Sequence, residues 1–352
     1  MRSLARACLA LALAIPWTGC GHACRCNAIV TAADEMAAQG KVDEAVASLL
    51  PAALGEENHE HADHLLFQAG LLLEKAGRHE EALAIWDPLL ARTTSMNIAG
   101  RIVYEKGMMY RDLGRLAEAE DQFELLVTGY PENGLAYTGL LRLEALVRDR
   151  AGDQAVRELL ERLLPGALES SFGDDVLWEL YVWHRNHGQE EEAKAYLLAI
   201  RQSYPFPTGE RSYETLFALA KMAEKEEDWQ SAIDYYQEVV GPIYKSPLIG
   251  NSSGESKADA FIAMGHIYED HLGDPETALH LYMEIVAMPD LMTKNDDGLI
   301  EAARLLAEMG KKDEACGKLA DLLTNYEFSN KRKKALEMAG EIQCPVPGEF
   351  QK

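Results

Sequence analysis

Apolar residues recur along most of this chain at intervals of three or four positions. Ahead of a glycine at position 188, for example, Leu177, Leu180, Tyr181 and His184 follow this spacing. Residues three and four apart share one face of an α-helix, so each such stretch predicts a helix with one packing face. The pattern stops at a glycine and starts again soon after it. The chain therefore reads as a series of helices joined by tight turns.

The turns themselves repeat. Seven turn positions are each followed after five residues by alanine and after nine residues by a bulky apolar side chain. The turn positions are Gly40, Gly77, Gly114, Gly188, Glu227, Gly273 and Gly310; the alanines are Ala45, Ala82, Ala119, Ala193, Ala232, Ala278 and Ala315. The 74-residue interval before Gly188 has room for one degenerate unit, with its turn at Gly152 and its alanine, Ala155, after only three residues. Eight units are therefore expected over residues 28–327.

Each unit is expected to be a pair of antiparallel helices. The turn glycine supplies the left-handed conformation that ends the first helix. Alanine allows the second helix to approach closely, and the bulky residue fills the space beyond it. Asp274 and Pro275 give one second helix an N-cap and a first-turn proline. One helical hairpin cannot bury its apolar face, so successive hairpins must stack into a solenoid.

This pattern resembles the tetratricopeptide repeat (TPR) over roughly 300 residues. The family's characteristic positions are filled best in the third unit, by Gly107, Tyr110, Gly114, Ala119, Phe123, Tyr130 and Pro131, and Tyr204-Pro205 repeats that ending in the fifth. The resemblance implies an all-α, right-handed solenoid of about eight helix-turn-helix units. We expect a loop insertion over 241–257 and a polar capping helix over Lys331–Gln343, within a C-terminal segment of residues 328–352.

The N-terminus looks like an export signal. Arg2 and Arg6 precede a short apolar run, Ala7–Ile15, which is too short to span a bilayer. The following Thr18-Gly19-Cys20 resembles a bacterial lipobox, in which the cysteine becomes the lipid-bearing N-terminus. Residues 1–19 are then a signal peptide and 20–27 a lipid attachment site and tether, and the protein is periplasmic and anchored to the outer membrane. Cleavage after Ala23, without lipid, is the alternative.

The composition of the chain argues against several classes of function. The 352 residues carry a formal charge of −24, which repels phosphate backbones and argues against nucleic acid as a ligand. An apolar fraction of 47% argues against wholesale disorder. Phosphate-loop, HExxH and CxxCH motifs are all missing from the sequence. We therefore expect neither catalysis nor a cofactor.

Two clusters suggest metal chemistry and have plainer explanations. His59, His61 and His64 fall within one predicted helix, where His61 and His64 are about 60° apart; a polar first turn explains them equally well. Cys24 and Cys26 follow Cys20 closely and offer soft ligands, or simply thiols near a lipid anchor. A soluble periplasmic protein that binds a ligand or metal is therefore kept as the alternative function.

In the TPR family, the position ten residues before the turn lines the concave groove. In the seven regular units, with the seventh counted with a one-residue turn insertion, it carries apolar or aromatic residues: Val30, Phe67, Tyr104, Trp178, Phe217, Ile262 and Ile300. The carboxylate clamp of chaperone-binding relatives needs Asn four residues later, and none occurs at those positions, which include Met108 and Val182. We expect Phe67, Tyr104, Met108, Arg111, Trp178, Val182, Arg185 and Phe217 to form a partner-binding groove. Packing against the preceding unit is the alternative.

The resemblance therefore implies a non-catalytic protein–protein interaction scaffold that binds other envelope proteins through its groove. It is similar to repeat lipoproteins that serve outer-membrane barrel assembly, pilus biogenesis or polysaccharide export.

Two expectations concern the C-terminus. The basic run at residues 331–334 is expected to neutralise Asp321 and Glu327, or else to contact an anionic partner. Cys316 and Cys344 lie at similar distances on either side of a turn near Ser329. In two antiparallel helices both sulfurs then reach the same end of the pair, which predicts a disulfide.

Overall fold

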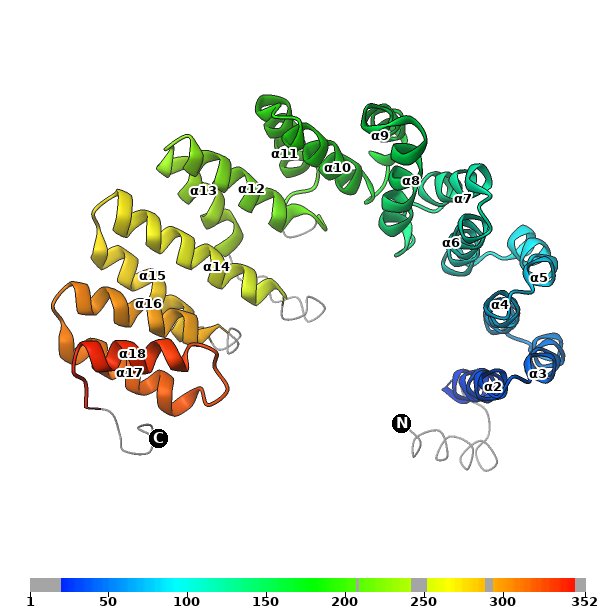
Figure 1. Cartoon of the computed structure of the whole chain (residues 1–352), viewed down its shortest axis with the longest axis horizontal. Coiled ribbons are helices and arrows are strands. Elements are labelled where there is room, and N and C mark those ends of the chain that lie inside the picture. Colours follow the sequence, from blue (N-terminus) through cyan, green and yellow to red (C-terminus); the bar gives the residue numbers. More distant parts are fainter. Residues whose placement is uncertain (1–19, 207–208, 242–251, 289–293, 346–352) are drawn as a thin grey trace. The chain divides into compact units, whose positions relative to one another are not determined.

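A computed structural model describes residues 20–206, 209–241, 252–288 and 294–345. Every regular element in these ranges is a helix. The chain forms two compact parts, an N-terminal part of residues 1–176 and a C-terminal part of residues 177–352 (Figure 1). The expected signal peptide and most of the expected 241–257 insertion lie outside the described residues.

The N-terminal part contains four helix pairs, and each helix packs against the next along the chain. The pairs are α2 (Cys20–Ala38) with α3 (Val42–Leu54), α4 (His59–Lys75) with α5 (His79–Arg92), α6 (Met96–Asp112) with α7 (Leu116–Gly129), and α8 (Ala136–Ala151) with α9 (Asp153–Ala167). First helices also touch the next first helix, as α4 touches α2 and α6. Helix α2 begins at Cys20, so the expected tether segment, residues 20–27, is helical.

The C-terminal part continues the same arrangement (Figure 1). Its elements are α10 (Gly173–Asn186), which begins in the N-terminal part, then α11 (Glu190–Ser203), α12 (Ser212–Lys225), α13 (Trp229–Val240), α14 (Ser252–His266), α15 (Pro275–Ala287), α16 (Asn295–Glu308), α17 (Lys312–Asn325) and α18 (Arg332–Glu341). A π-helical turn, η1 (Ile267–His271), extends α14. The first helix of the seventh unit is one residue longer before its turn than the first helices of the other units, and the wider π-helical turn accommodates this extra residue.

All eight expected turn positions adopt positive φ, seven glycines and Glu227. At Gly114 the N–H donates to the Arg111 carbonyl while the N–H of Arg115 donates to that of Tyr110. This pair of bonds is the Schellman ending, which satisfies the last carbonyls of a helix. Glu227 has φ of 59°, so one unit uses a side-chain-bearing residue in a conformation that favours glycine.

The seven expected alanines are at most 1% exposed, as are the bulky residues four positions later, which are Leu49, Trp86, Phe123, Leu197, Tyr236, Tyr282 and Leu319. The fourth unit differs from expectation. Ala155 is only half-buried, and Val156 and Leu160 take the two core positions. Because α9 begins directly at Asp153, its buried face falls one residue earlier than in the other units.

Glycines in three first helices accommodate the bulkiest of these side chains. A Cβ atom at Gly70 would lie 2.2 Å from Nε1 of Trp86, and one at Gly107 would lie 2.7 Å from the Phe123 ring. Gly265 has the same relation to Tyr282, at 2.3 Å. The aromatic ring therefore occupies the volume that any larger residue on the first helix would need.

Polar contacts between successive units occur at a similar sequence separation. Arg78 pairs with Asp43 at 2.5 Å and Lys311 with Glu276 at 3.0 Å, both 35 residues apart. The side-chain amide of Asn133 donates to two carbonyls at the start of α6, from Met96 and Asn97. These contacts keep each unit in register with its neighbour.

Helix α18 covers the last unit. Ala335 and Ala339 are buried in a cluster that also contains Leu299, Ile300, Leu319, Leu322 and Leu323. The expected disulfide is present: Cys316 and Cys344 are bonded, with their Cα atoms 5.4 Å apart. The staple therefore joins α17 to the residues that follow the capping helix.

The partners expected for the basic run were wrong. Lys331 pairs with Asp297 at 2.8 Å and Lys334 approaches Glu301 at 3.5 Å. Both partners lie on α16, whereas Asp321 lies on α17 and Glu327 just after it. Helix α18 occupies the place of another first helix, and first helices contact the preceding first helix.

Replacing Glu227 with glycine should raise the free energy of unfolding by about 0.5–1 kcal/mol, because the strain of positive φ disappears. A matched control is Ala76→Gly, at an exposed helix-end position with φ of −84°, which should lower it by about the same amount. Urea unfolding followed by circular dichroism measures both. Equal destabilisation by the two glycines would show that Glu227 is unstrained.

Candidate functional site

Helix α6 presents three of the expected groove residues on one face. Tyr104, Met108 and Arg111 are each half-buried and stand four and three residues apart. The Tyr104 ring meets Phe123 edge-on, with centroids 5.9 Å apart. We call these three residues the α6 surface.

Phe67 does not belong to a surface, contrary to expectation. It is fully buried, with its ring 6.2 Å from that of Trp86 and the Arg101 guanidinium 4.4 Å from its centroid. Trp86 also donates its indole N–H to the Phe67 carbonyl at 3.2 Å. The packing alternative is therefore correct for Phe67. Ile300 is buried for the same kind of reason, because α18 covers it.

Helix α10 carries the second group. Trp178 and Val182 are half-buried against a core of Tyr181, Ala193, Leu197 and Leu219, and Ala218 and Met222 of α12 pack against that same core. Arg185, seven residues after Trp178, is exposed. We call Trp178, Val182, Arg185, Ala218 and Met222 the α10 surface.

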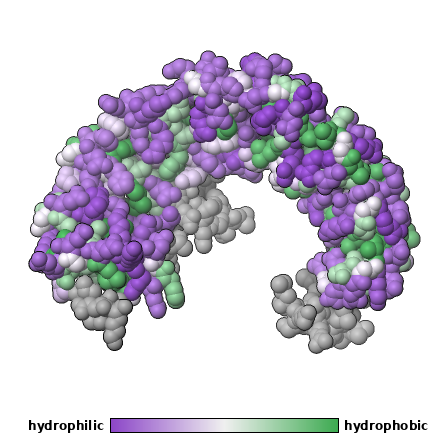
Figure 2. All heavy atoms as spheres, in the orientation of Figure 1, coloured by the Kyte–Doolittle hydropathy of each residue, from purple (hydrophilic) through white to green (hydrophobic). Residues whose placement is uncertain are grey.

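The two surfaces share three kinds of side chain in the same register. An aromatic residue, an apolar residue four positions later and an arginine three positions after that occur in both α6 and α10. Phe217 of α12 is also half-buried, but its ring packs between Tyr213 and Tyr236, at 4.6 and 5.0 Å. Its helix continues with Lys221 and Glu224, which pair with each other at 2.8 Å. Space-filling shows small apolar patches among mainly polar side chains (Figure 2).

Units 7 and 8 replace this arrangement with a charge network. Arg304 binds both oxygens of Glu269, at 2.6 and 2.7 Å, and also reaches Glu301 and Glu308. His266 lies 3.7 Å from Glu301. His266 and Arg304 each stand four residues after a groove position, Ile262 and Ile300. The sequence did not single out the carboxylates, because Glu residues are common throughout the chain.

The network shifts the ionisation of its members. Interaction with His266 makes the largest contribution to lowering the pKa of Glu301, followed by Arg304 and Lys334. Together they outweigh the effect of partial burial, which raises this pKa, and bring it to about 2. Hydrogen bonding from Arg304 lowers the pKa of Glu269. Both carboxylates are therefore held ionised, which makes the network a structural tie between helices α14, α16 and α18.

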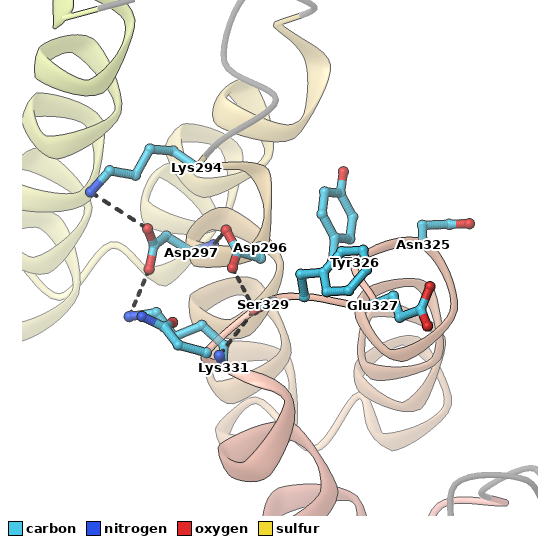
Figure 3. Close-up of a pocket in the computed structure, with 10 residues that line it drawn as sticks. Lys294, Asp296, Asp297, Asn325, Tyr326, Glu327, Ser329 and Lys331 are labelled. Carbon is cyan, nitrogen blue, oxygen red and sulfur yellow. Dashed lines mark hydrogen bonds and ion pairs between the residues drawn. The ribbon is translucent and has the colours of Figure 1, made fainter.

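A hollow of about 710 Å³ lies between the start of α16, the end of α17 and the loop before α18 (Figure 3). Three of its charged groups are paired: Lys294 and Lys331 both bind Asp297, at 3.8 and 2.8 Å. The Ser329 hydroxyl donates to Asp296 at 2.5 Å. Phe328 at its edge is 95% exposed. The pairing makes this hollow another contact between units.

The candidate metal residues are dispersed or engaged. His59 is exposed and His61 and His64 are half-buried on α4, and burial lowers the pKa of His64. The carboxylate of Asp63 between them binds Arg92 at 2.9 Å. Cys26 is buried, and burial together with Glu56 raises its pKa. In the described ranges no group of three or more His, Cys, Asp or Glu side chains is placed to hold a metal ion.

Among the described helices, none combines the length and the apolar character needed to cross a bilayer.

The helix pairs, glycine turns and stacked units define an α-solenoid of helical hairpins. Three segments of the chain, residues 67–134, 215–244 and 297–329, match sequence profiles described as tetratricopeptide repeat. These three segments are similar to the TPR family, and the all-α TPR-type solenoid fold expected from the sequence is confirmed.

Solved structures similar to this chain include other repeat proteins. A TPR repeat-containing protein of Cytophaga hutchinsonii is 13% identical, covering 76% of this chain and 98% of its own, with a TM-score of 0.40. PilF of Pseudomonas aeruginosa is 16% identical, covering 62% and 92%, with a TM-score of 0.32. No curated protein matches the sequence. Function must therefore be argued from the surfaces.

Acid should weaken the α14–α16–α18 network. Because the pKa of Glu301 is lowered to about 2, its contribution is complete above its ordinary pKa of 4.5 and is lost as the pH falls toward 2. Glu301→Gln should therefore cost roughly 2–3 kcal/mol at neutral pH and little at pH about 2.5.

The control is Asp321→Asn, at an exposed carboxylate of α17 with no ion pair in the described part of the chain. It should have little effect at either pH. Urea unfolding at the two pH values decides, and an equal cost of Glu301→Gln at both would contradict the assignment.

Proposed function

We propose that this protein is a non-catalytic protein–protein interaction scaffold of the bacterial cell envelope, acting in the assembly or export of an envelope complex. The similarity to the TPR family supports the general role, since TPR proteins are generally non-catalytic scaffolds. The observation that carries the proposal is the repeated surface on α6 and α10. Both helices present an aromatic, an apolar and a cationic side chain on the same face.

The surfaces have the properties of protein-binding sites. Tyr and Trp offer large contact areas at low entropic cost, and Arg adds hydrogen bonds, which is why these three residues dominate binding energy at interfaces. The half-buried Tyr104 and Trp178 each have one ring neighbour on their own unit, Phe123 and Tyr181, which supports them in a defined orientation. A partner then has less side-chain freedom to remove on binding.

The cellular address in this proposal comes from the N-terminal sequence. A positively charged start, a short apolar run and Thr18-Gly19-Cys20 support export and lipid attachment at Cys20, which would hold the protein at the outer membrane. The disulfide between Cys316 and Cys344 fits an oxidising compartment. A soluble periplasmic ligand- or metal-binding protein was the alternative, and nothing in the geometry of His61 and His64 favours it.

Replacing Cys20 with serine should move the protein from the membrane fraction to the soluble fraction, because acyl chains on that residue are the proposed anchor. Cys24→Ser is the matched control and should leave the protein in the membrane fraction. Fractionation of cells with immunoblotting measures both. A native protein that is soluble and begins at Cys24 would contradict the anchor.

Removing the aromatic side chains should weaken partner binding. Tyr104→Ala and Trp178→Ala should each lower the affinity for a co-purifying envelope partner by about 1–3 kcal/mol without loss of helix content. Leu125→Ala and Leu198→Ala are matched controls, since each removes a 41%-exposed apolar side chain from the second helix of the same unit. Unchanged binding with lowered stability would assign both aromatic residues to packing alone.

A further inference from the structure

Arg185 is one of the few described arginines of this acidic chain that are not paired with a carboxylate. With 58 acidic and 34 basic residues, most described arginines are bound to a carboxylate; Arg150 and Arg162, for example, hold Glu120 and Glu124. Arg185 is exposed and donates only to the Tyr181 hydroxyl, at 3.3 Å, with its guanidinium 5.3 Å from that ring. Within the described residues, no carboxylate forms an ion pair with it. Its cationic charge is therefore available to a ligand.

The charge lies at the end of an apolar surface. Trp178 and Val182 precede Arg185 on the same helix face, and Ala218 and Met222 of α12 pack against the same core as these two residues. Helix α12 also carries a cationic side chain, Lys221, but this side chain is bound to Glu224 at 2.8 Å. The α10 surface thus combines one unpaired guanidinium with half-buried apolar side chains.

We propose that the α10 surface binds a partner-protein segment in which a carboxylate stands beside apolar side chains. The proposal rests on the proposed function and specifies the partner for one of its two surfaces. Guanidinium groups bind carboxylates through two parallel hydrogen bonds, and a neighbouring apolar contact excludes water and strengthens them. An excess of acidic groups elsewhere on the chain repels acidic segments, so a carboxylate binds favourably only where an arginine is unpaired.

The α6 surface provides an internal comparison. Arg111 has the same register as Arg185, but its guanidinium is bound to Asp112 at 2.6 Å. The α6 surface therefore offers apolar contacts with a neutralised charge. Preference for a carboxylate is expected at the α10 surface and not at the α6 surface.

The test uses peptides selected from a displayed library of random peptides on the full-length exported protein. Selected peptides that compete with one another are synthesised in pairs, with each Asp or Glu retained or replaced by Asn or Gln. We expect a class with a carboxylate beside Leu, Phe or Trp, whose affinity falls roughly ten- to hundredfold on neutralisation. Arg185→Gln should cause the same loss for the acidic peptide and none for its neutral version.

Two controls make the loss specific. Arg201→Gln removes an arginine that binds Glu238 on α13, in the same part of the chain, and should leave the affinity unchanged. Arg111→Gln should also leave it unchanged. Circular dichroism confirms that each variant retains its helix content, which an exposed position such as Arg185 allows.

The outcomes separate this inference from the proposed function. If the acidic and neutral peptides bind equally and only Trp178→Ala weakens them, the α10 surface binds partners but the carboxylate preference is wrong. If neither Trp178→Ala nor Arg185→Gln changes any affinity, the surface is not a docking site and both proposals fail there. A library that yields no binder with a carboxylate overturns the inference directly.

Discussion

The close approach of the two helices within each unit is the constraint on which the rest of the structure depends. A small residue on the first helix faces a large buried residue on the second, as Gly107 faces Phe123 and Gly70 faces Trp86. Where glycine is replaced by alanine in the first helix, as at Ala33, the second helix carries the smaller Leu49. In these three units a larger residue on the second helix thus meets a smaller one on the first, which close packing favours. The turn between the helices must be tight enough to keep this register, and a residue with positive φ provides it.

One face of each first helix packs against the second helix of its unit. The remaining positions of the first helix differ in how far neighbouring side chains cover them. Phe67 and Tyr104 occupy the same position in successive units, yet Phe67 is covered by Trp86 and Arg101 while Tyr104 stays half-exposed. In the last units the corresponding face is filled by the Arg304 network and by α18. Surfaces open to a partner are therefore confined to units whose neighbours leave the face uncovered.

The charged side chains likewise divide into those that pair between units and those left open to a partner. Many carboxylates are used in pairs that tie one unit to the next, such as Asp43 with Arg78 and Glu269 with Arg304. Each such pair on the surface contributes little alone, but a recurrent set favours one register over a slipped one. Against that background an arginine without a carboxylate partner, Arg185, marks a site where an outside carboxylate is favoured. Which ligand a surface can bind thus depends on which of its charged side chains are already paired within the fold.

The repeat pattern by itself determined the helical hairpins, all eight turns and the buried alanines of seven units, because these depend on local geometry that the regular units repeat. It also determined the Cys316–Cys344 disulfide, since two antiparallel helices around one turn bring equal sequence distances together. Only the tertiary structure decided how deeply Phe67 and Tyr104 are buried, which carboxylates Lys331 and Lys334 bind, and that Val156 replaces Ala155 in the fourth core. Such features depend on side chains supplied by other helices. A periodic pattern places residues on a face, but the neighbouring unit decides whether that face is covered.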